Sequence, residues 1–289
     1  MSLKEYSLFS PAKINLFLEI LSKRNDGFHN LNSLMCFCNI GDKIKISKSE
    51  SYSLNITGPF SDDLKSKNNI ITDTLKKLEI FFNKKFSVSI VLEKNLPISS
   101  GMGGGSSNAA TIVRAIINIF NLDIKKLDLD KLLISIGSDV PFCFYGKSSI
   151  VSGIGEKVVP LKHLEDLKVL LVNPLVEIST KSIFHQIKCF NTNPTNFPRE
   201  KINRSKLIGI LNQSKNDLQY IVTKKNTQVN EVIDFFKNET ESSFYRMTGS
   251  GATCFGVFDT YSHMKKAEVK LKNKNNNWWI ASAKTLNYI

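Results

Sequence analysis

The sequence predicts a mixed fold of strands and helices arranged in two domains. Strict alternation of apolar and polar residues over 6–20 indicates a strand near the start of the chain. A run of glycines at 101–105 lies between a second alternating stretch and a helical pattern. The composition changes after Gly155, where a polar turn and Pro160 precede an apolar strand. Because a domain commonly takes about 100 to 200 residues, we expect domains at 1–160 and 161–289.

The composition is that of an ordinary soluble globular protein, with 42% hydrophobic and 22% charged residues. No apolar run reaches the roughly 18 residues that a membrane helix needs, and the first ten residues lack the apolar core of a signal peptide. The five cysteines form no CxxC pair, so we expect free thiols in the cytoplasm and no metal site. In the CxC of Cys36 and Cys38, a core role is favoured over metal binding.

The net charge of +13 is compatible with nucleic acid, a membrane surface or anionic metabolites as partners. The lysines are scattered along the chain, which favours a solvated surface that still attracts a polyphosphate substrate. We therefore expect no nucleic-acid and no membrane partner. A basic nucleic-acid-binding protein remains the alternative from a different class.

Two polar residues near the start of the chain point the same way from the predicted strand. Lys13 and Asn15 alternate with apolar residues, and Pro11 just before them suggests an edge or the beginning of the strand. A lysine at such a place can face a cleft, whereas a lone strand lysine is ordinarily solvated. After an Asp-Gly turn, Phe28 and His29 form a pair that could stack on and hydrogen-bond a planar base, or anchor the loop.

Further strands and helices follow from periodicity and capping signals. We expect strands at 43–47, 53–57, 88–92, 167–172 and 278–284, and two more on either side of a Gly-Ser-Gly turn within 247–258. We expect helices at 69–82, 110–120, 130–136, 205–211, 228–236 and 260–272, and a short one capped by Ser179 that contains Phe184; the polar stretch 191–204 should be a loop that can move.

The glycine-rich run is suited to phosphate. Glycines let the backbone approach an anion closely, and the positive end of the following helix dipole favours negative charge. The run lacks the Lys-Ser/Thr ending of a Walker loop, and it does not follow a strand directly as a dinucleotide fingerprint would. An unliganded glycine hairpin or linker is the alternative. The candidate phosphate ligands are Gly101, Gly103, Gly104, Gly105, Ser106 and Ser107.

Asp139 follows the end of a short predicted helix and precedes the apolar residues Val140, Pro141 and Phe142. A carboxylate at such a place is costly unless it is paired or functional, which makes it a candidate for catalysis. An Asp that caps or turns the chain explains the same pattern equally well.

Several separated segments together resemble the GHMP small-molecule kinases. They are PAKINLFL at 11–18, PxxxGxGGGSSNAA at 97–110, GSDVPFCFYG at 137–146 and MTGSGATCF at 247–255, and they occur in the family's order and spacing. Within the family, RNDGFHNL at 24–31 resembles the cytidine-binding segment of the kinases that act on diphosphocytidyl-methylerythritol. A GHMP kinase for another alcohol, such as mevalonate or homoserine, is the alternative that this segment disfavours.

The resemblance implies an α+β fold with two domains. The N-terminal domain would be related to a ribosomal-protein fold, and the C-terminal domain would be ferredoxin-like. It also implies transfer of the ATP γ-phosphate to the erythritol 2-hydroxyl, in the non-mevalonate route to isoprenoid precursors. ATP with Mg²⁺ would be the cofactors, diphosphocytidyl-methylerythritol the small-molecule substrate, and a monomer or weak homodimer the assembly.

The resemblance further implies roles for individual residues. Asp139 matches the family's base, and Lys13 matches the lysine that keeps this carboxylate ionised and offsets charge on the phosphoryl group. ATP would be bound by Lys94, Pro97 and the glycine-rich residues already named, and the substrate by Asn15, Phe28, His29, Phe184, Gly249, Ser250 and Gly251. The sequence departs from the usual family residues at three loop positions, Ser99, Ser100 and Met102. It also has Phe28 where tyrosine is frequent in the family.

Overall fold

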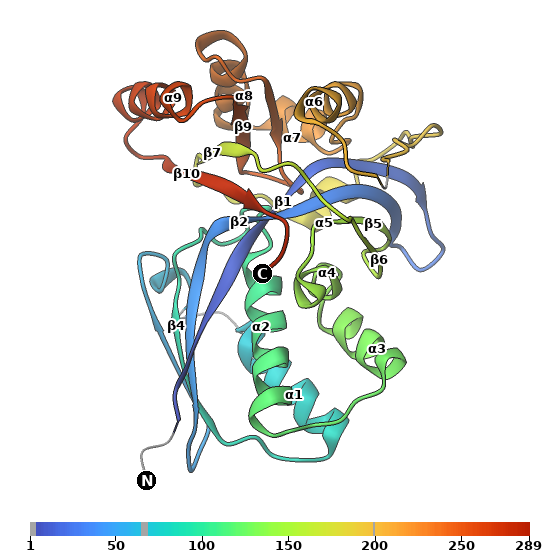
Figure 1. Cartoon of the computed structure of the whole chain (residues 1–289), viewed down its shortest axis with the longest axis vertical. Helices are drawn as coiled ribbons and strands as arrows, with labels where there is room; N and C mark the ends of the chain where they lie inside the picture. Colours follow the sequence, from blue (N-terminus) through green and yellow to red (C-terminus); the bar gives the residue numbers. More distant parts are fainter. Residues whose placement is uncertain (1–3, 65–68, 199) are drawn as a thin grey trace. The chain divides into compact units, whose positions relative to one another are not determined.

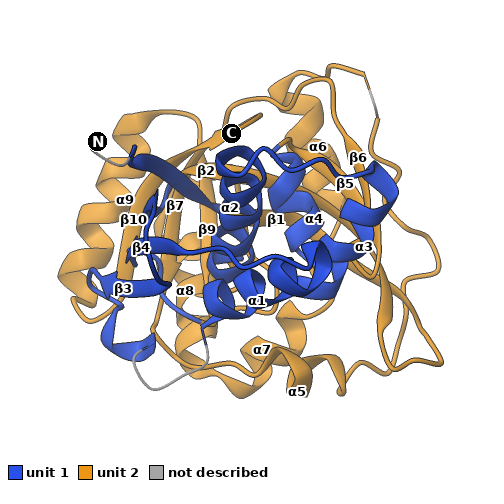
Figure 2. Cartoon of the chain, turned by 90° about the horizontal axis from the view of Figure 1, so that it is seen from below, with its two compact units in different colours: residues 1–12, 40–98, 103–146 blue, residues 13–39, 99–102, 147–289 orange. Residues whose placement is uncertain are grey.

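The computed structural model describes residues 4–64, 69–198 and 200–289. They fall into two compact units, coloured separately in Figure 2: one contains the described residues up to Ala12, Ile40–Ile98 and Gly103–Gly146, and the other contains Lys13–Asn39, Ser99–Met102 and Lys147–Ile289. We call them unit 1 and unit 2. The elements in chain order (Figure 1) are β1 Tyr6–Lys23, β2 His29–Lys48, β3 Ser53–Thr57, the 3₁₀ turn Asp62–Leu64, α1 Ile70–Phe82, β4 Val88–Glu93, α2 Gly104–Ile119, α3 Lys126–Ile136, α4 Val140–Tyr145, β5 Ser149–Gly153, β6 Lys157–Pro160, β7 Lys168–Asn173, α5 Thr180–Phe184, α6 Arg204–Gln213, α7 Gln219–Lys225, α8 Thr227–Glu239, β8 Phe244–Met247, β9 Cys254–Phe258, α9 Tyr261–Lys274 and β10 Trp279–Leu286.

The two units share the long strands β1 and β2, whose residues pass from one unit to the other. The predicted strand at 6–20 is confirmed, but the suggestion that Pro11 marks its beginning was wrong because β1 already starts at Tyr6. Every residue from Ser10 to Ile20 is buried, so β1 is covered on both faces. The compact units are therefore discontinuous in sequence, whereas the division at residue 160 remains a proposal.

Unit 1 packs helices with a small sheet. β4 pairs in parallel with β3, placing Ser53 opposite Ser89, and antiparallel with β2, placing Lys43 opposite Glu93. The predicted helix at 69–82 is confirmed as α1, where the Asn69 side chain accepts a hydrogen bond from the backbone N–H of Ile71 at 2.9 Å. α1 and α2 lie side by side (Figure 1), and α2 also packs on α4. α2 begins inside the glycine run, earlier than its apolar periodicity indicates.

Unit 2 contains the antiparallel strand order β10-β7-β9-β8, with Ala281 opposite Leu171 and Arg246 opposite Phe255. Helices α8 and α9 contact these strands and enclose an apolar core. In the same unit β2 pairs with β5 and, through Cys38 opposite Thr285, with β10. Apolar periodicity did not reveal four elements, α4, α7, β5 and β6, because each has only four to seven residues.

In the loop expected at 191–204, the described residues 191–198 and 200–203 are irregular, and α6 begins at Arg204. Within its described residues, Phe197 and Ile202 are buried, and the backbone N–H of Asn191 donates to the carbonyl of Ile20 at 2.8 Å. Along the described parts of the chain, no helix has the length and apolarity needed to cross a membrane.

Candidate functional site

The start of α2 in unit 1 has the properties expected of an anion site. Its N-cap residue, Gly103, has a left-handed backbone with φ of 62° and contributes no side-chain cap. The first amides of a helix have no partner within the helix and point outward. The hydroxyl of Ser107 and the Oδ1 atom of Asn108 are buried without a hydrogen-bond partner among the described residues. This terminus therefore offers N–H donors to an anion, and two buried polar oxygen atoms lie in the same turn of the helix.

Lys94 and Asp42 form a buried ion pair beside α2. The Nζ atom of Lys94 lies 2.7 Å from Oδ2 of Asp42, which also accepts a hydrogen bond from Nδ2 of Asn108 at 3.0 Å. The other carboxylate oxygen accepts from the backbone N–H groups of Asn95 and Leu96 at 2.8 and 2.9 Å. Burial lowers the pKa of Lys94, while the Asp42 carboxylate acts in the opposite direction. The pair fixes Lys94 at the entrance to the glycine run.

Two glycine turns approach each other closely within unit 2. Gly101 has φ of 75°, and a Cβ atom there would lie 2.3 Å from the carbonyl oxygen of Thr248. Gly249 has φ of 56°, and its Cβ would lie 2.8 Å from the carbonyl oxygen of Gly101. Ser250 shares a hydrogen bond of 2.7 Å with the hydroxyl of Thr180. The structure therefore brings the first glycine of the loop to the predicted Gly249, Ser250 and Gly251 turn, where only glycine tolerates this backbone geometry.

Lys13 and Asn15 belong to one buried hydrogen-bond network in unit 2. Lys13 is only 3% exposed, and its Nζ donates to Oδ1 of Asn15 at 2.7 Å. Asn15 in turn donates from Nδ2 to the hydroxyl of Ser33 at 2.8 Å and from its backbone N–H to the hydroxyl of Thr248 at 2.8 Å. A solvated role for Lys13 is therefore excluded. Sequence reasoning gave no role to Thr248, whose hydroxyl joins this network to the glycine turn.

Asp139 is half-buried in unit 1, directly before α4. Its side chain makes no capping hydrogen bond to α4, and only its backbone carbonyl takes part in the helix, accepting from Cys143 at 3.0 Å. Arg114 of α2 donates to the carbonyls of Cys143 and Phe144 at 2.7 and 3.0 Å, which ties the far end of α4 to α2. The structure therefore does not support a side-chain cap by Asp139, whereas its position in the turn before α4 agrees with the turn alternative.

The predicted aromatic residues lie in unit 2 around the start of β2. The ring of His29 is 8% exposed and lies 5.3 Å from the ring of Phe184. Phe28 is 54% exposed. Burial lowers the pKa of His29, and the positive charges of Lys23 and His185 act in the same direction. The structure thus joins His29 to Phe184, and it adds Phe190, whose ring centroid is 6.3 Å from that of His29.

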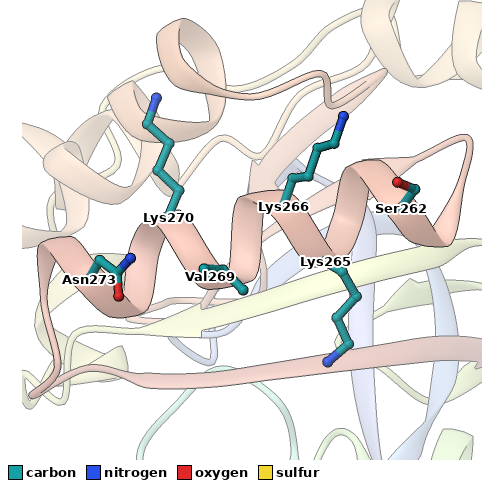
Figure 3. A pocket seen from close by; sticks show the side chains of 6 residues that line it. All are labelled: Ser262, Lys265, Lys266, Val269, Lys270 and Asn273. Atoms are coloured by element: carbon teal, nitrogen blue, oxygen red, sulfur yellow. The ribbon is translucent and has the colours of Figure 1, made fainter.

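No group of three or more His, Cys, Asp or Glu side chains in the described residues could hold a metal ion. A surface depression lies on α9, lined by side chains of that helix alone. Figure 3 shows Lys265 on the opposite side of the helix from Lys266 and Lys270. Lys265 is paired with Glu268, and Lys270 with Glu239. This depression includes none of the predicted site residues.

The comparison with known proteins decides the family. Residues 69–147 match the model of the GHMP kinases N-terminal domain, and residues 199–277 match that of the GHMP kinases C-terminal domain. A 4-diphosphocytidyl-2-C-methyl-D-erythritol kinase of Chelativorans sp. (strain BNC1) is 35% identical over 279 residues, covering 96% of this chain and 94% of that relative. The chain belongs to the GHMP kinases. Its α+β fold, predicted from the resemblance, is confirmed.

Solved structures of other GHMP kinases share the fold of this GHMP kinase. A crystal structure of 4-(cytidine 5'-diphospho)-2C-methyl-D-erythritol kinase superimposes with a TM-score of 0.77 at 23% identity, covering 97% of this chain and 100% of that chain. Homoserine kinase from Cytophaga hutchinsonii superimposes with a TM-score of 0.71 at 16% identity, covering 100% and 96%. Because kinases for different alcohols share this fold, the fold alone does not select the acceptor.

Sequence reasoning missed the residues that support the site from a distance. Asp42 lies in an alternating strand segment, IGDKIKI, where a carboxylate between apolar positions could have indicated a buried pair. Asn108 and Thr248 are adjacent to motif residues but carry no pattern of their own. Phe190 is separated from Phe184 by a stretch without regular structure, so periodicity could not place it.

Proposed function

We infer that the chain transfers the γ-phosphate of ATP to the erythritol 2-hydroxyl of 4-diphosphocytidyl-2-C-methyl-D-erythritol, in the non-mevalonate route to isoprenoid precursors. The observation that carries this inference is the 35% identity to a kinase of that name over 96% of the chain. The uncapped start of α2 supports it, because a helix N-terminus with close backbone access suits a polyphosphate.

ATP binding is assigned to the glycine-rich run. The amides of Gly101, Gly103, Gly104 and Gly105 and the side chains of Ser106 and Ser107 would bind the phosphates. Lys94 and Pro97, just before the run, would lie on the nucleoside side. The buried pair of Lys94 with Asp42 supports this assignment, because it orders the chain that leads into the run.

Mg²⁺ would accompany ATP and offset charge on the phosphates during transfer. The residues at the start of α2 fit such an ion, since the buried hydroxyl of Ser107 is an oxygen donor without a partner among the described residues. Ser107 stays assigned to the phosphates that carry the ion, and phosphate oxygens and water would supply the ligands of the ion.

Catalysis is assigned to Asp139 as the base that accepts the proton of the attacking hydroxyl, with Lys13 as its electrostatic partner. Asp139 is half-buried directly before α4, a setting in which a carboxylate requires a partner or a function, and this supports the assignment. Lys13 is a buried cation oriented by Asn15, so its charge is weakly screened. Positioning and electrostatics are most of what phosphoryl transfer requires of a protein.

Substrate binding is assigned to Asn15, Phe28, His29, Phe184, Gly249, Ser250 and Gly251. Phe28 and Phe184 would stack on the cytosine, and His29 would hydrogen-bond to its edge. The contact between His29 and Phe184 supports this arrangement. The glycine turn at 249–251 would close on the substrate.

The wider setting is also proposed. Residues 1–160 would carry ATP binding and catalysis, and 161–289 the C-terminal kinase domain. The chain would work in the cytoplasm as a monomer or weak homodimer, without nucleic-acid or membrane partners. Four of the five cysteines are buried free thiols, which supports a reducing compartment.

The proposed function is tested by measuring ADP release with ATP and Mg²⁺ while 4-diphosphocytidyl-2-C-methyl-D-erythritol, mevalonate and homoserine are offered separately. We expect turnover with the cytidine compound alone. Turnover with mevalonate or homoserine instead would keep the kinase but discard the proposed acceptor. Absence of turnover with all three, in a folded protein that binds ATP, would contradict the acceptor class.

A further inference from the structure

A second phenylalanine, besides Phe184, contacts His29, the histidine that we assign to the edge of the cytosine. The ring centroid of Phe190 lies 6.3 Å from that of His29 with the planes tilted by 38°, while Phe184 lies 5.3 Å away. Phe190 is 38% exposed, so part of its ring is open to solvent. The imidazole of His29 thus contacts the rings of Phe184 and Phe190, and the exposed part of the Phe190 ring can contact a ligand.

The segment that carries Phe190 is fixed to the strands of unit 2. The next residue, Asn191, donates its backbone N–H to the carbonyl of Ile20 at 2.8 Å. Glu19, which is 2% exposed, accepts from the backbone N–H of Thr195 at 2.8 Å and from its hydroxyl at 2.7 Å. Asn32 of β2 donates to Glu19 at 2.9 Å and to the carbonyl of Thr195 at 3.0 Å.

These anchors give Phe190 a defined position. A buried carboxylate is costly unless it is fully hydrogen-bonded, and here Glu19 receives bonds from two elements. The segment therefore joins β1 and β2 close to His29, the first residue of β2. An exposed phenylalanine alone needs no explanation. Here an exposed phenylalanine lies in an irregular segment that is hydrogen-bonded to β1 and β2, next to the ring of a histidine, and this is the arrangement of a ligand-binding wall.

We propose that Phe190 is a further specificity-determining residue, an aromatic wall beside His29 against which the cytosine ring of the substrate packs. This proposal rests on the proposed function, since it concerns the nucleobase end of the same substrate. Phe28 and Phe184 are assigned to the two faces of the cytosine, so Phe190 would contact the edge of this ring. An aromatic wall there adds contact area without charge and orients the planar ring toward the imidazole. Because Phe190 would contact the cytosine and not the reacting hydroxyl, its loss should weaken binding of the acceptor substrate more than it slows phosphoryl transfer.

The test compares Phe190→Ala and Phe190→Leu with the unaltered protein in steady-state kinetics. We expect Phe190→Ala to raise KM for the cytidine substrate about ten-fold, with kcat within about two-fold and KM for ATP unchanged. Phe190→Leu keeps apolar volume but not the aromatic ring, so its KM for the cytidine substrate should lie between those of the unaltered protein and Phe190→Ala. If the alanine variant does not fold, the KM of the leucine variant tests the proposal. Tyr220→Ala removes another exposed aromatic of unit 2 and should leave all three constants unchanged.

A milder variant tests the anchor. Thr195→Val removes the hydroxyl that donates to Glu19 without changing side-chain volume much, and should raise KM for the cytidine substrate by about two- to five-fold. Unchanged KM values in both Phe190 variants of an active enzyme would overturn the inference alone. The inference would also be overturned if the Phe190 variants raised KM for ATP as much as KM for the cytidine substrate and lost kcat. Absence of activity in the unaltered protein would overturn the proposed function together with it.

Discussion

At the scale of single residues, burial distinguishes interpretations that the sequence leaves equal. Lys13 could have been a solvated strand lysine, but it is buried and bonded to Asn15. Asp139 could have been a cap, but its side chain makes no capping bond. The solvated alternative is excluded for Lys13, whereas Asp139 still occupies the turn before α4.

The base assignment predicts a large kinetic defect in Asp139→Asn. The amide keeps the shape of the side chain but cannot accept the hydroxyl proton, so kcat should fall by at least about 100-fold while KM for ATP stays the same. Asp123→Asn, at an exposed position of the same unit, is the matched control and should be fully active. Turnover of folded Asp139→Asn within about five-fold of the unaltered enzyme would remove the base assignment.

His29 should titrate below its usual range. Burial lowers its pKa, so the folded protein binds this proton less tightly than the unfolded chain does. The contribution of neutral His29 to the free energy of unfolding is therefore fully present above about pH 6.5. It is lost as the pH falls through the pKa of His29 in the folded protein. NMR titration of the imidazole should give a pKa under 6.5 that rises in Phe184→Ala, since that variant exposes the ring. A pKa at or above 6.5 in the unaltered protein would contradict the burial argument.

At the scale of elements, strong periodicity and clear caps made secondary structure predictable. α1 was found from its apolar face and Asn69, and β1 from alternation. The short α4 was missed because six residues, one of them a proline, carry no readable period. The early start of α2 was missed because glycines are poor helix formers, and here the tertiary setting overrides propensity.

The start of α2 predicts different outcomes for two glycine substitutions. At Gly104, a Cβ atom would lie 3.3 Å from Nζ of Lys94 and 3.6 Å from Oδ2 of Asp42, so Gly104→Ala should disturb the buried pair and raise KM for ATP about ten-fold or more. Gly209→Ala lies in α6 with nothing within 4 Å and should stabilise the protein by up to about 1 kcal/mol with normal kinetics. Equal KM for ATP in both variants would contradict a phosphate site at this helix start.

At the scale of the whole molecule, the sequence placed the motifs but not their grouping. The division at 160 follows a change in composition, whereas unit 2 also contains 13–39 and 99–102. Hydrogen bonds across a long sequence separation cannot be read from local patterns; Arg246, which donates to the carbonyl of Leu16 at 2.9 Å, is an example. The motifs indicated the candidate site residues, whose roles stay predictions, but they did not indicate buried supporting groups such as Asp42 and Glu19.

Unit 2 includes the segments 13–39 and 99–102, so we expect that a fragment of residues 161–289 does not fold alone. It would lose the pairing of β10 with β2 and leave the buried guanidinium of Arg246 without the Leu16 carbonyl. Circular dichroism should show no cooperative thermal transition for the fragment, while the full chain shows one. A cooperative transition of the fragment would support an independent domain beginning at 161.

The most direct test of the account is to identify the product. The purified chain should be incubated with ATP, Mg²⁺ and 4-diphosphocytidyl-2-C-methyl-D-erythritol, and the new phosphate located by ³¹P NMR with coupling to the carbon skeleton. We expect one new phosphomonoester, on the erythritol 2-hydroxyl, formed in step with ADP. A phosphate at another hydroxyl, or ADP formed without a phosphorylated cytidine compound, would contradict it.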